Sequence, residues 1–298
     1  MYFFKKCISI LYLKIVGKLS RGKGYGQKHK FLKSTITKTE SILKTDYAET
    51  WGGKIYVHSS DTGSLSTLSI SGTFGPRDTQ TVKDNVRPGD FVIDLGANIG
   101  YYTCLLAKLV GKDGKVFAFE PDPRNLKLLE KNIRVNEYNN VVIVDKAVSD
   151  VNDMCTLYCS EKTFGASTIF ESEKTKTKNC FPIKSETVSL DSYFEKLNLH
   201  NKIDFIKIDI EGAEFKAFNG MKKILQSNSN LKIFTEITPL LLDNANSTVG
   251  YVLDFLADYK FTNIFLSDNR KNVLSKISKQ ELLSHMKNSN SANILCIK

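Results

Sequence analysis

The 298-residue sequence predicts an α/β fold built on a largely parallel sheet. Two observations support this fold class. From residue 91 onward, short apolar runs of strand length alternate with segments of helical periodicity, and such alternation is typical of helices that connect parallel strands. The apolar run 91–95 also ends in a turn bracketed by Gly96 and Gly100, and a helical pattern follows at 101–110. A strand, a glycine turn and a helix in this order are typical of a ligand-binding loop.

The glycine turn differs from the loop that binds dinucleotides. That loop requires three glycines in the pattern G-x-G-x-x-G, and its closely spaced pair admits a pyrophosphate. Here Gly96 and Gly100 flank the sequence Ala-Asn-Ile, so the close pair is missing. The turn therefore predicts a smaller ligand without a phosphate group.

The remaining elements follow from periodicity and turn residues. Ahead of the glycine loop, the runs 54–57 and 65–70 around a turn at 61–63 predict a β-hairpin, and 79–86 predict a helix that ends before Pro88. Further strands are expected at 115–119, 141–145, 203–208, 231–237, 261–266 and 292–297. Further helices are expected at 99–110, 123–137, 211–226, 247–258 and 278–287.

Glu120 follows the strand 115–119, about twenty residues beyond Gly100. In a strand-helix-strand unit the second strand lies beside the first, so an acid at its carboxyl end is placed to accept hydrogen bonds from both hydroxyls of a ribose. The alternative is a glutamate that merely ends a strand before the turn Pro121-Asp122-Pro123. The glycine loop upstream favours the ribose interpretation.

A third strand, 203–208, is followed by Asp209 and Glu211, and Lys207 interrupts its apolar pattern. Ligands of open α/β sheets bind outside the carboxyl ends of the strands. We therefore expect Asp209 and Glu211 to face the same crevice as the glycine loop. Glu214 is better explained as an acid that complements the dipole at the start of the next helix.

Five ordered segments carry a resemblance to one enzyme family. They are DLGANIGYYT, VFAFEPDPRN, LEKNIRVN, AVSD and IDFIKIDIEGAE. In this order and at these distances they resemble the FkbM-type S-adenosylmethionine-dependent methyltransferases, from roughly residue 41 to residue 298. The resemblance implies a Rossmann-like, seven-stranded methyltransferase sheet with helices on both faces and an antiparallel last strand. It also implies O-methylation, usually of sugars or polyketides.

One position departs from the family pattern. Ahead of the first strand the family tends to read Gly-x-Tyr-Glu-Pro, whereas this chain reads Gly72-Thr73-Phe74-Gly75-Pro76. Gly75 thus replaces a glutamate. If that carboxylate helps to hold cofactor or acceptor, the chain must achieve this otherwise or lose activity.

The resemblance implies cofactor contacts along one edge of the sheet. The residues expected to hold the methionine part of S-adenosylmethionine are Asp94, Gly96, Asn98, Gly100 and Tyr101. Glu120 is expected to bind the ribose, and Asp145 the adenine amine.

Methyl transfer to a hydroxyl is an in-line displacement in which the alcohol must also lose a proton. Candidate proton acceptors are Asp209, Glu211 and Glu236, with Asp209 expected first and Glu211 next. Glu236 equally suits a buried, hydrogen-bonded end of a strand.

Histidine and cysteine usage bears on metals and on the cellular compartment. The 4 histidines are far apart, which argues against a histidine-built metal site, and nothing in the sequence supports an oxygen-ligated Mg²⁺. We therefore predict no metal. The 6 cysteines are scattered without a C-x-x-C pair, which favours reduced thiols in a cytoplasmic protein.

The net charge of +10 belongs to the first 39 residues, which contain 10 basic residues and no acidic one. The rest of the chain is neutral, so it lacks the electrostatic footprint of a dedicated nucleic-acid binder. An RNA methyltransferase therefore remains only an alternative, further weakened by the absence of an Asn-Pro-Pro-aromatic motif for a flipped base. A second alternative, suggested by Gly75, is a scaffold that keeps the fold without turnover.

Apolar residues recur at helical spacing between Phe4 and Leu19, with lysines elsewhere around the helix, so this segment is predicted to form a basic amphipathic helix. Its longest uncharged run, 7–13, is too short to span a bilayer. The helix suits either peripheral contact with the anionic inner surface of a membrane or packing on its own domain or a second subunit.

The sequence divides into three parts. Residues 1–40 form the basic arm, 41–90 an extension with the hairpin and helix, and 91–298 the methyltransferase domain. Within this domain a polar insertion at about 149–187 is expected to contain a hairpin around Cys155–Cys159. Its turn 165–168 either borders the acceptor pocket or is an ordinary solvated loop. The expected acceptor is a glycan, a glycolipid or a related small metabolite.

Overall fold

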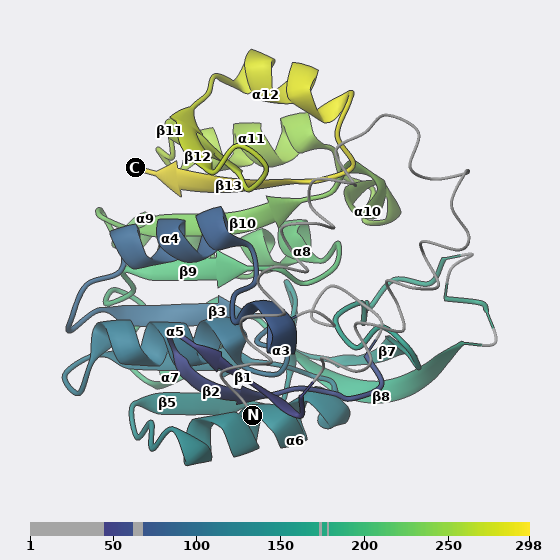
Figure 1. The fold of residues 1–298 in the computed structure, drawn as a ribbon. Coiled ribbons are helices and arrows are strands. Elements are labelled where there is room, and N and C mark those ends of the chain that lie inside the picture. The colour runs from purple at the N-terminus through teal and green to yellow at the C-terminus, as the bar shows by residue number, and fades with distance from the viewer. Residues whose placement is uncertain (1–44, 62–67, 173–174, 178) are drawn as a thin grey trace.

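The structure, a computed structural model, describes residues 45–61, 68–172, 175–177 and 179–298. The predictions for the basic arm, 1–40, therefore lie outside the described residues. The central sheet has eight strands in the order β12-β11-β13-β10-β9-β3-β4-β5 (Figure 1). The alternation of strands with helices along the chain, and the parallel direction of most strands, agree with the predicted α/β fold.

Five neighbouring strands of this sheet are parallel, and their bounds follow the predicted runs closely. They are β3 (Phe91–Leu95), β4 (Lys115–Phe119), β5 (Val141–Val144), β9 (Phe205–Ile208) and β10 (Lys232–Ile237). Their carboxyl ends therefore meet at one edge, and in Figure 1 the arrowheads of β3 and β9 point to the same side. This edge carries the functional residues discussed below.

The antiparallel end of the sheet confirms one prediction and adds a strand. The last strand, β13 (Ala292–Ile297), lies antiparallel between β10 and β11 (Asn263–Asp268). An eighth strand, β12 (Val273–Lys276), pairs with β11 at the edge, where seven strands were expected. The reason is a tight turn: the carboxylate of Asp268 accepts hydrogen bonds from the backbone N–H groups of Arg270 and Lys271 and returns the chain along β11.

Helices cover both faces of the sheet. Alternate residues of each strand point to opposite faces, so each face packs against its own helices and forms a separate core. Val92 packs with α4 (Pro76–Asn85), α5 (Tyr101–Val110) and α6 (Pro123–Val135) on one face. Ile93 belongs to the core of the other face. The helices of that face are α7 (Leu190–Lys196), α8 (Glu214–Asn219), α9 (Lys222–Ser227), α11 (Val249–Asp258) and α12 (Lys279–Met286). The single helix predicted at 211–226 is in fact two, because the chain breaks at Gly220 and the fully buried Met221.

Residues 62–67 of the predicted N-terminal hairpin lie outside the described residues, and the described part pairs differently from the prediction. The hairpin joins β1 (Tyr47–Thr50) to β2 (Gly53–Tyr56), whereas Leu68–Ser71 forms the short helix α3. The two residues Trp51 and Gly52 close this hairpin, and Gly53 follows with a positive φ of +107°. Asn132 on α6 also bonds to both the N–H and the carbonyl of Tyr56, which fixes β2 on the domain.

The polar insertion forms a small second sheet next to the carboxyl edge of the main sheet. Its strands are β6 (Ala147–Val148), β8 (Cys180–Val188) and β7 (Met154–Ser160), in the spatial order β6-β8-β7. The expected strand around Cys155–Cys159 is therefore present, but its antiparallel partner is β8, which follows about twenty residues later. Figure 1 shows the β7–β8 hairpin on the side to which the parallel strands point. A further short helix, α10 (Pro239–Asn244), follows β10.

Candidate active site

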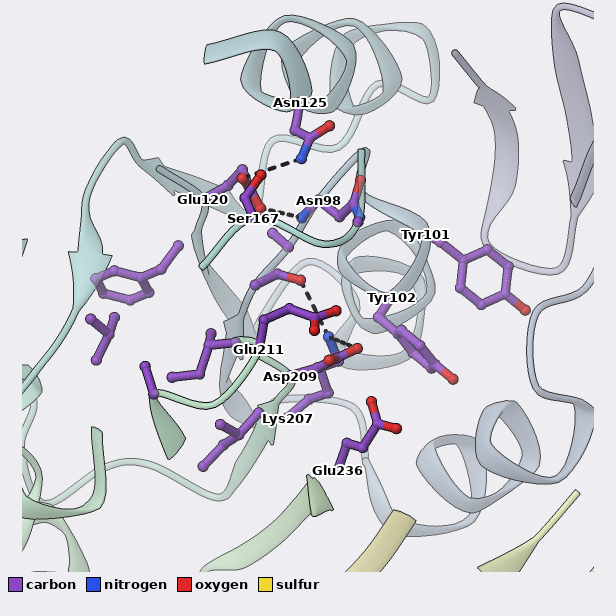
Figure 2. Close-up of a pocket in the computed structure, with 18 of the residues that line it drawn as sticks. Asn98, Tyr101, Tyr102, Glu120, Asn125, Ser167, Lys207, Asp209, Glu211 and Glu236 are labelled. Carbon is purple, nitrogen blue, oxygen red and sulfur yellow. Dashed lines mark hydrogen bonds and ion pairs between the residues drawn. The ribbon is translucent and has the colours of Figure 1, made fainter. Parts of the chain in front are cut away.

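A cavity of about 750 Å³ opens at the carboxyl ends of the parallel strands (Figure 2). Its lining comes from the loop after β3, the ends of β4, β9 and β10, the start of α4, and the polar insertion. The predicted residues that line it are Gly96, Asn98, Tyr101, Glu120, Asp209, Glu211 and Glu236. The parallel strand order thus brings together residues that are up to 140 positions apart.

The glycine loop lies against the ends of two neighbouring strands. The backbone N–H groups of Gly96 and Ala97 both donate to the carbonyl of Phe119, at 3.0 Å. Gly96 has a φ of +75°, and a Cβ at this position would overlap the carbonyl oxygen of Asp209. Only glycine therefore fits at the point where the loop passes the end of β9.

Glu120 is held by three hydrogen-bond donors at the side of this loop. One carboxylate oxygen accepts the backbone N–H of Asn98 at 2.7 Å, and the other accepts the backbone N–H of Asp122 at 2.9 Å and the side-chain amide of Asn125 at 3.4 Å. The side chain is almost completely buried, and burial raises the pKa of Glu120 to about 7. Figure 2 shows it close to Asn98 and Asn125. A fixed carboxylate suits the two hydroxyl donors of a ribose.

Asp94 lies behind the cavity wall rather than in it. Its carboxylate is fully buried, accepts a hydrogen bond from the Thr103 hydroxyl at 2.6 Å, and lies 3.6 Å from Nζ of Lys207. Burial raises the pKa of Asp94, against the opposing effect of Lys207. Gly100 likewise does not line the cavity. We expected direct ligand contacts from both residues, and the structure places them one layer deeper because the loop covers the end of β3.

Asp145 was predicted to reach the adenine, and the structure does not bring it to the site. Its side chain is exposed, and it is not among the residues that line the cavity. The chain turns after β5, so its neighbour Lys146 lines the cavity and forms an ion pair with Glu186.

Lys207 is the central cation of the site and was not among the predicted site residues. Its Nζ lies 3.6 Å from a carboxylate oxygen of Asp94 and 3.6 Å from one of Asp209, and it donates to the carbonyl of Gly96 at 3.3 Å. Burial alone would lower the pKa of Lys207, but Asp209 and Asp94 raise it above its usual value. A lysine that interrupts a buried strand beside two acids was the signal available in the sequence.

Three carboxylates face the cavity from the ends of β9 and β10, as Figure 2 shows. Asp209 is paired with Lys207, whereas Glu211 follows in a left-handed conformation with a φ of +52°. Burial raises the pKa of Glu211 to about 8, and the nearby carboxylates of Asp209 and Glu236 add to the rise. Burial and Asp209 also raise the pKa of Glu236. Glu211 and Glu236 therefore bind protons more tightly than ordinary surface carboxylates.

Glu214 does not line the cavity, in agreement with its interpretation as a helix-start acid. Its carboxylate accepts the backbone N–H groups of Ile210 at 3.2 Å and Gly212 at 3.3 Å, just ahead of α8. It therefore fixes the turn that carries Glu211.

A polar wall built around Asp78 was not predicted from the sequence. The carboxylate of Asp78 accepts hydrogen bonds from Ser267 at 2.6 Å, Asn269 at 2.5 Å and Asn293 at 3.1 Å. A Cβ at Gly75 would lie 2.7 Å from this carboxylate, so Asp78 supplies a carboxylate beside the position where the family pattern has glutamate. Its partners come from the far end of the chain, where sequence spacing gives no signal.

The insertion supplies the opposite wall. Gly165 and Ser167 line the cavity, the hydroxyl of Ser167 donates to Asp122 at 3.0 Å, and that of Thr168 donates to the carbonyl of Glu211 at 2.9 Å. The turn therefore lies at the cavity, and Ala166 within it is also exposed to solvent. Its Thr168 is hydrogen-bonded to the backbone of Glu211, which is one of the candidate bases.

Two further features concern metals and membranes. No group of three or more His, Cys, Asp or Glu residues in the described ranges is arranged to hold a metal ion. In the same part of the chain, no helix has both the length and the apolar composition needed to cross a membrane.

Comparison with known proteins decides the family. A family model described as methyltransferase FkbM domain matches residues 94–262, which is more than half of the chain. The chain belongs to the FkbM methyltransferase family. A second model, for protein-L-isoaspartate(D-aspartate) O-methyltransferase, matches residues 36–150 of this FkbM methyltransferase.

Curated relatives match shorter stretches of the FkbM methyltransferase. Protein-L-isoaspartate O-methyltransferase 1 of Archaeoglobus fulgidus is 32% identical over 60 residues, or 20% of this chain and 28% of the relative. Methyltransferase sdnD of Sordaria araneosa is 26% identical over 162 residues, or 46% of this chain and 62% of the relative. The chain thus spans less than two thirds of the length of either protein.

Solved structures similar to this chain include a methyltransferase FkbM from Methylobacillus flagellatus KT. Its sequence identity is 13% and its TM-score 0.42, and the match covers 79% of this chain and 53% of that one. A SAM-dependent O-methyltransferase from Thermotoga maritima gives 15% identity and a TM-score of 0.40, covering 87% and 81% of the two chains.

As a member of this family the chain is expected to take S-adenosylmethionine as methyl donor, and two features of the cavity suit this molecule. Glu120 is a buried carboxylate whose raised pKa favours further hydrogen-bond donors, and two ribose hydroxyls are such donors. The loop Gly96–Tyr101 lies beside it at the same edge, where it would hold the methionine part. The individual contacts remain predictions.

Proposed function

We propose that this FkbM methyltransferase transfers a methyl group to a sugar hydroxyl of a glycan, a glycolipid or a related metabolite. The observation that carries the proposal is the group of carboxylates, Asp209, Glu211 and Glu236, which face the cavity beside the cofactor loop. A hydroxyl must lose a proton during methylation, and a carboxylate within hydrogen-bond reach is an ordinary means of removing it. The carboxylate and amides around Asp78 also suit an acceptor rich in hydroxyl groups.

S-adenosylmethionine supplies a methyl group on a positively charged sulfur. The chain's contribution is to hold the reacting groups in line and to exclude other geometries. Gly96, Asn98 and Tyr101 would hold the methionine part, and Glu120 the ribose. Since Asp145 lies outside the cavity, the apolar lining residues Val148 and Leu157 are better placed to enclose the adenine.

We propose Glu211, rather than Asp209, as the base that takes the hydroxyl proton. Asp209 is already engaged in an ion pair, 3.6 Å from Nζ of Lys207. Among the described residues, no cation pairs with Glu211, and burial raises its pKa to about 8. A base is most effective when its pKa lies near the working pH.

The reaction is tested with purified protein, labelled S-adenosylmethionine and a panel of glycans and glycolipids. We expect label on a sugar oxygen, located by mass spectrometry of the product. Label on RNA instead would favour the alternative of an RNA methyltransferase. Cofactor binding without transfer to any acceptor would favour a scaffold that lacks turnover.

The base assignment is tested by comparing Glu211→Gln with Asp209→Asn and Glu236→Gln. We expect Glu211→Gln to lower kcat by about 10²–10⁴-fold, which is the usual contribution of general-base catalysis. The ascending limb of the pH profile near pH 8 should vanish in this variant only. If the limb persists in Glu211→Gln and vanishes in Asp209→Asn, the base is Asp209.

We further propose that the enzyme works in the cytoplasm at a membrane surface and meets acceptors built on lipid carriers. The support is the sequence of residues 1–39, with an apolar stripe and 10 basic residues without an acidic one.

A further inference from the structure

The cavity is lined by more acidic than basic residues. Its charged lining residues in the described part of the chain are Asp78, Glu120, Asp209, Glu211, Glu236, Lys146 and Lys207. Lys146 is paired with Glu186, and Lys207 is shared between Asp94 and Asp209. Within the described ranges, neither Glu211 nor Glu236 forms an ion pair, although Lys207 opposes the rise in the pKa of each. The end of the cavity that carries these two acids therefore favours a positively charged ligand.

The same acids must lie close to the methyl donor. A base reaches the acceptor oxygen by a hydrogen bond, and that oxygen attacks in line with the methyl group and the sulfur. The cofactor loop and the acids also lie against each other in the structure, because Gly96 packs directly on the backbone of Asp209. The sulfur carries a positive charge before transfer and none afterwards. Charge at this end of the cavity therefore distinguishes donor from product.

We propose that Glu211, with Asp209 and Glu236, binds the sulfonium donor in preference to the neutral product S-adenosylhomocysteine, and that this difference promotes product release. The inference deepens the proposed function, because it rests on the placement of Glu211 beside the reacting groups. It does not depend on the identity of the acceptor.

The groups that face Glu211 determine how the preference varies with pH. They are Lys207 and Asp209 from β9, Glu236 from β10, and Glu214 from the start of α8. Burial and the three acids keep Glu211 protonated up to a pKa of about 8. A nearby cation favours loss of this proton. The contribution of Glu211 to donor affinity therefore increases as the pH rises through 8, whereas its contribution to product affinity stays small.

The test is calorimetric titration of the full chain with S-adenosylmethionine and, separately, with S-adenosylhomocysteine at pH 6.5 and pH 9. Both ligands carry an α-amino group that itself loses a proton at alkaline pH, so each variant is compared with the unmodified protein at the same pH. The variants are Glu211→Gln, which removes the charge, and Glu211→Asp, which retains it. The matched control is Asp243→Asn, which removes an exposed acid from α10 beside the cavity wall.

At pH 9 we expect Glu211→Gln to weaken S-adenosylmethionine binding about tenfold and to change S-adenosylhomocysteine binding by less than about twofold. At pH 6.5 the effect on the donor should be smaller. Glu211→Asp and Asp243→Asn should stay close to the unmodified protein.

An equal loss of affinity for both ligands would overturn the proposal, because it would mean that Glu211 acts on the shape of the cavity. Unchanged affinity for both would overturn it as well. Failure on sugar acceptors, with the binding results as expected, would overturn only the proposed acceptor class. Failure of the unmodified chain to bind S-adenosylmethionine would overturn both the inference and the cofactor assignment.

Discussion

At the residue scale, Glu120 offers the most direct test of cofactor binding. Glu120→Ala removes a carboxylate that is already aligned by Asn98, Asp122 and Asn125. The ribose hydroxyls would lose a charged acceptor worth about 1.5–3 kcal/mol, so the Kd for S-adenosylmethionine should rise roughly 10- to 150-fold. Calorimetry measures this change.

The control for this variant is Glu130→Ala, which removes an exposed acid from α6, close along the chain. It should leave the Kd unchanged. If Glu120→Ala also binds the cofactor normally while remaining folded, the ribose assignment is wrong.

Glu211 also makes a prediction about stability in the absence of ligand. Its pKa rises from an ordinary value of 4.5 to about 8 on folding, so the folded state holds the proton more tightly than the unfolded state. This contribution to stability is complete below pH 4.5 and is lost as the pH rises through 8. Glu211→Gln cannot ionise, and it should therefore be more stable than the unmodified protein at pH 9, by on the order of 2 kcal/mol.

Urea unfolding at pH 4.5 and pH 9 measures this difference. The two proteins should differ little at pH 4.5. A constant difference at both pH values would indicate that the substitution acts through packing, and not through the charge of Glu211.

Single residues also show what sequence could and could not predict about the site. Glu120, Asp209 and Glu211 reach the same cavity because each lies within three residues of the carboxyl end of a parallel strand, and strand order determines where such ends lie. Asp145 also follows a strand, but the chain turns after β5 and leaves it exposed. Asp78 was missed because its partner Asn293 lies about two hundred positions away, with no local motif.

At the scale of elements, a comparison of two glycines separates the strain of a left-handed backbone from the effect of a close backbone contact. Gly96 and Gly89 both have positive φ values, +75° and +89°, but only Gly96 lies against another backbone. Gly89→Ala should therefore cost only the strain of the left-handed backbone, about 1–2 kcal/mol, and leave cofactor binding intact.

Gly96→Ala adds a clash with the carbonyl of Asp209. We expect it to cost more than about 3 kcal/mol and to abolish measurable cofactor binding, since the loop and the end of β9 must move apart. Thermal unfolding and calorimetry on both variants test this. Equal effects of the two substitutions would show that the close approach at Gly96 is unimportant.

The elements themselves were predicted well where a pattern was local. The bounds of β3 and β4 match the predicted runs because each is a short, continuous apolar strand that ends at a turn signal. The hairpin was wrong because β1 has weak alternation and its closing turn contains Trp51 and Gly52 rather than an Asn-Gly pair. The pairing of β7 with β8 across a long loop also leaves no periodic signal.

At the scale of the whole molecule, the concentration of basic residues in the first 39 positions predicts membrane affinity. Each basic residue close to an anionic surface contributes about 1 kcal/mol, and salt weakens this contribution by screening. The full chain should therefore sediment with anionic vesicles, less so at high salt. A chain that begins at Ser41 should not sediment, but should retain cofactor binding and turnover on soluble acceptors.

Neutral vesicles and a circular dichroism spectrum of the shortened chain serve as controls. The contrary result is a full chain that fails to sediment with anionic vesicles and a shortened chain that unfolds or changes oligomeric state. That result would show that the first 39 residues pack on the protein and do not contact a membrane.

The position of β13 has a consequence for how the protein is made. Residues 292–297 lie between β10 and β11, so the ribosome must synthesise them before the sheet can close, although every other strand already exists by then. Until that moment β10 and β11 each present an unpaired edge, which is a template for association with other chains. Nascent chains released before residue 292 should therefore aggregate or recruit chaperones, whereas loss of the peripheral strand β12 should be tolerated far better.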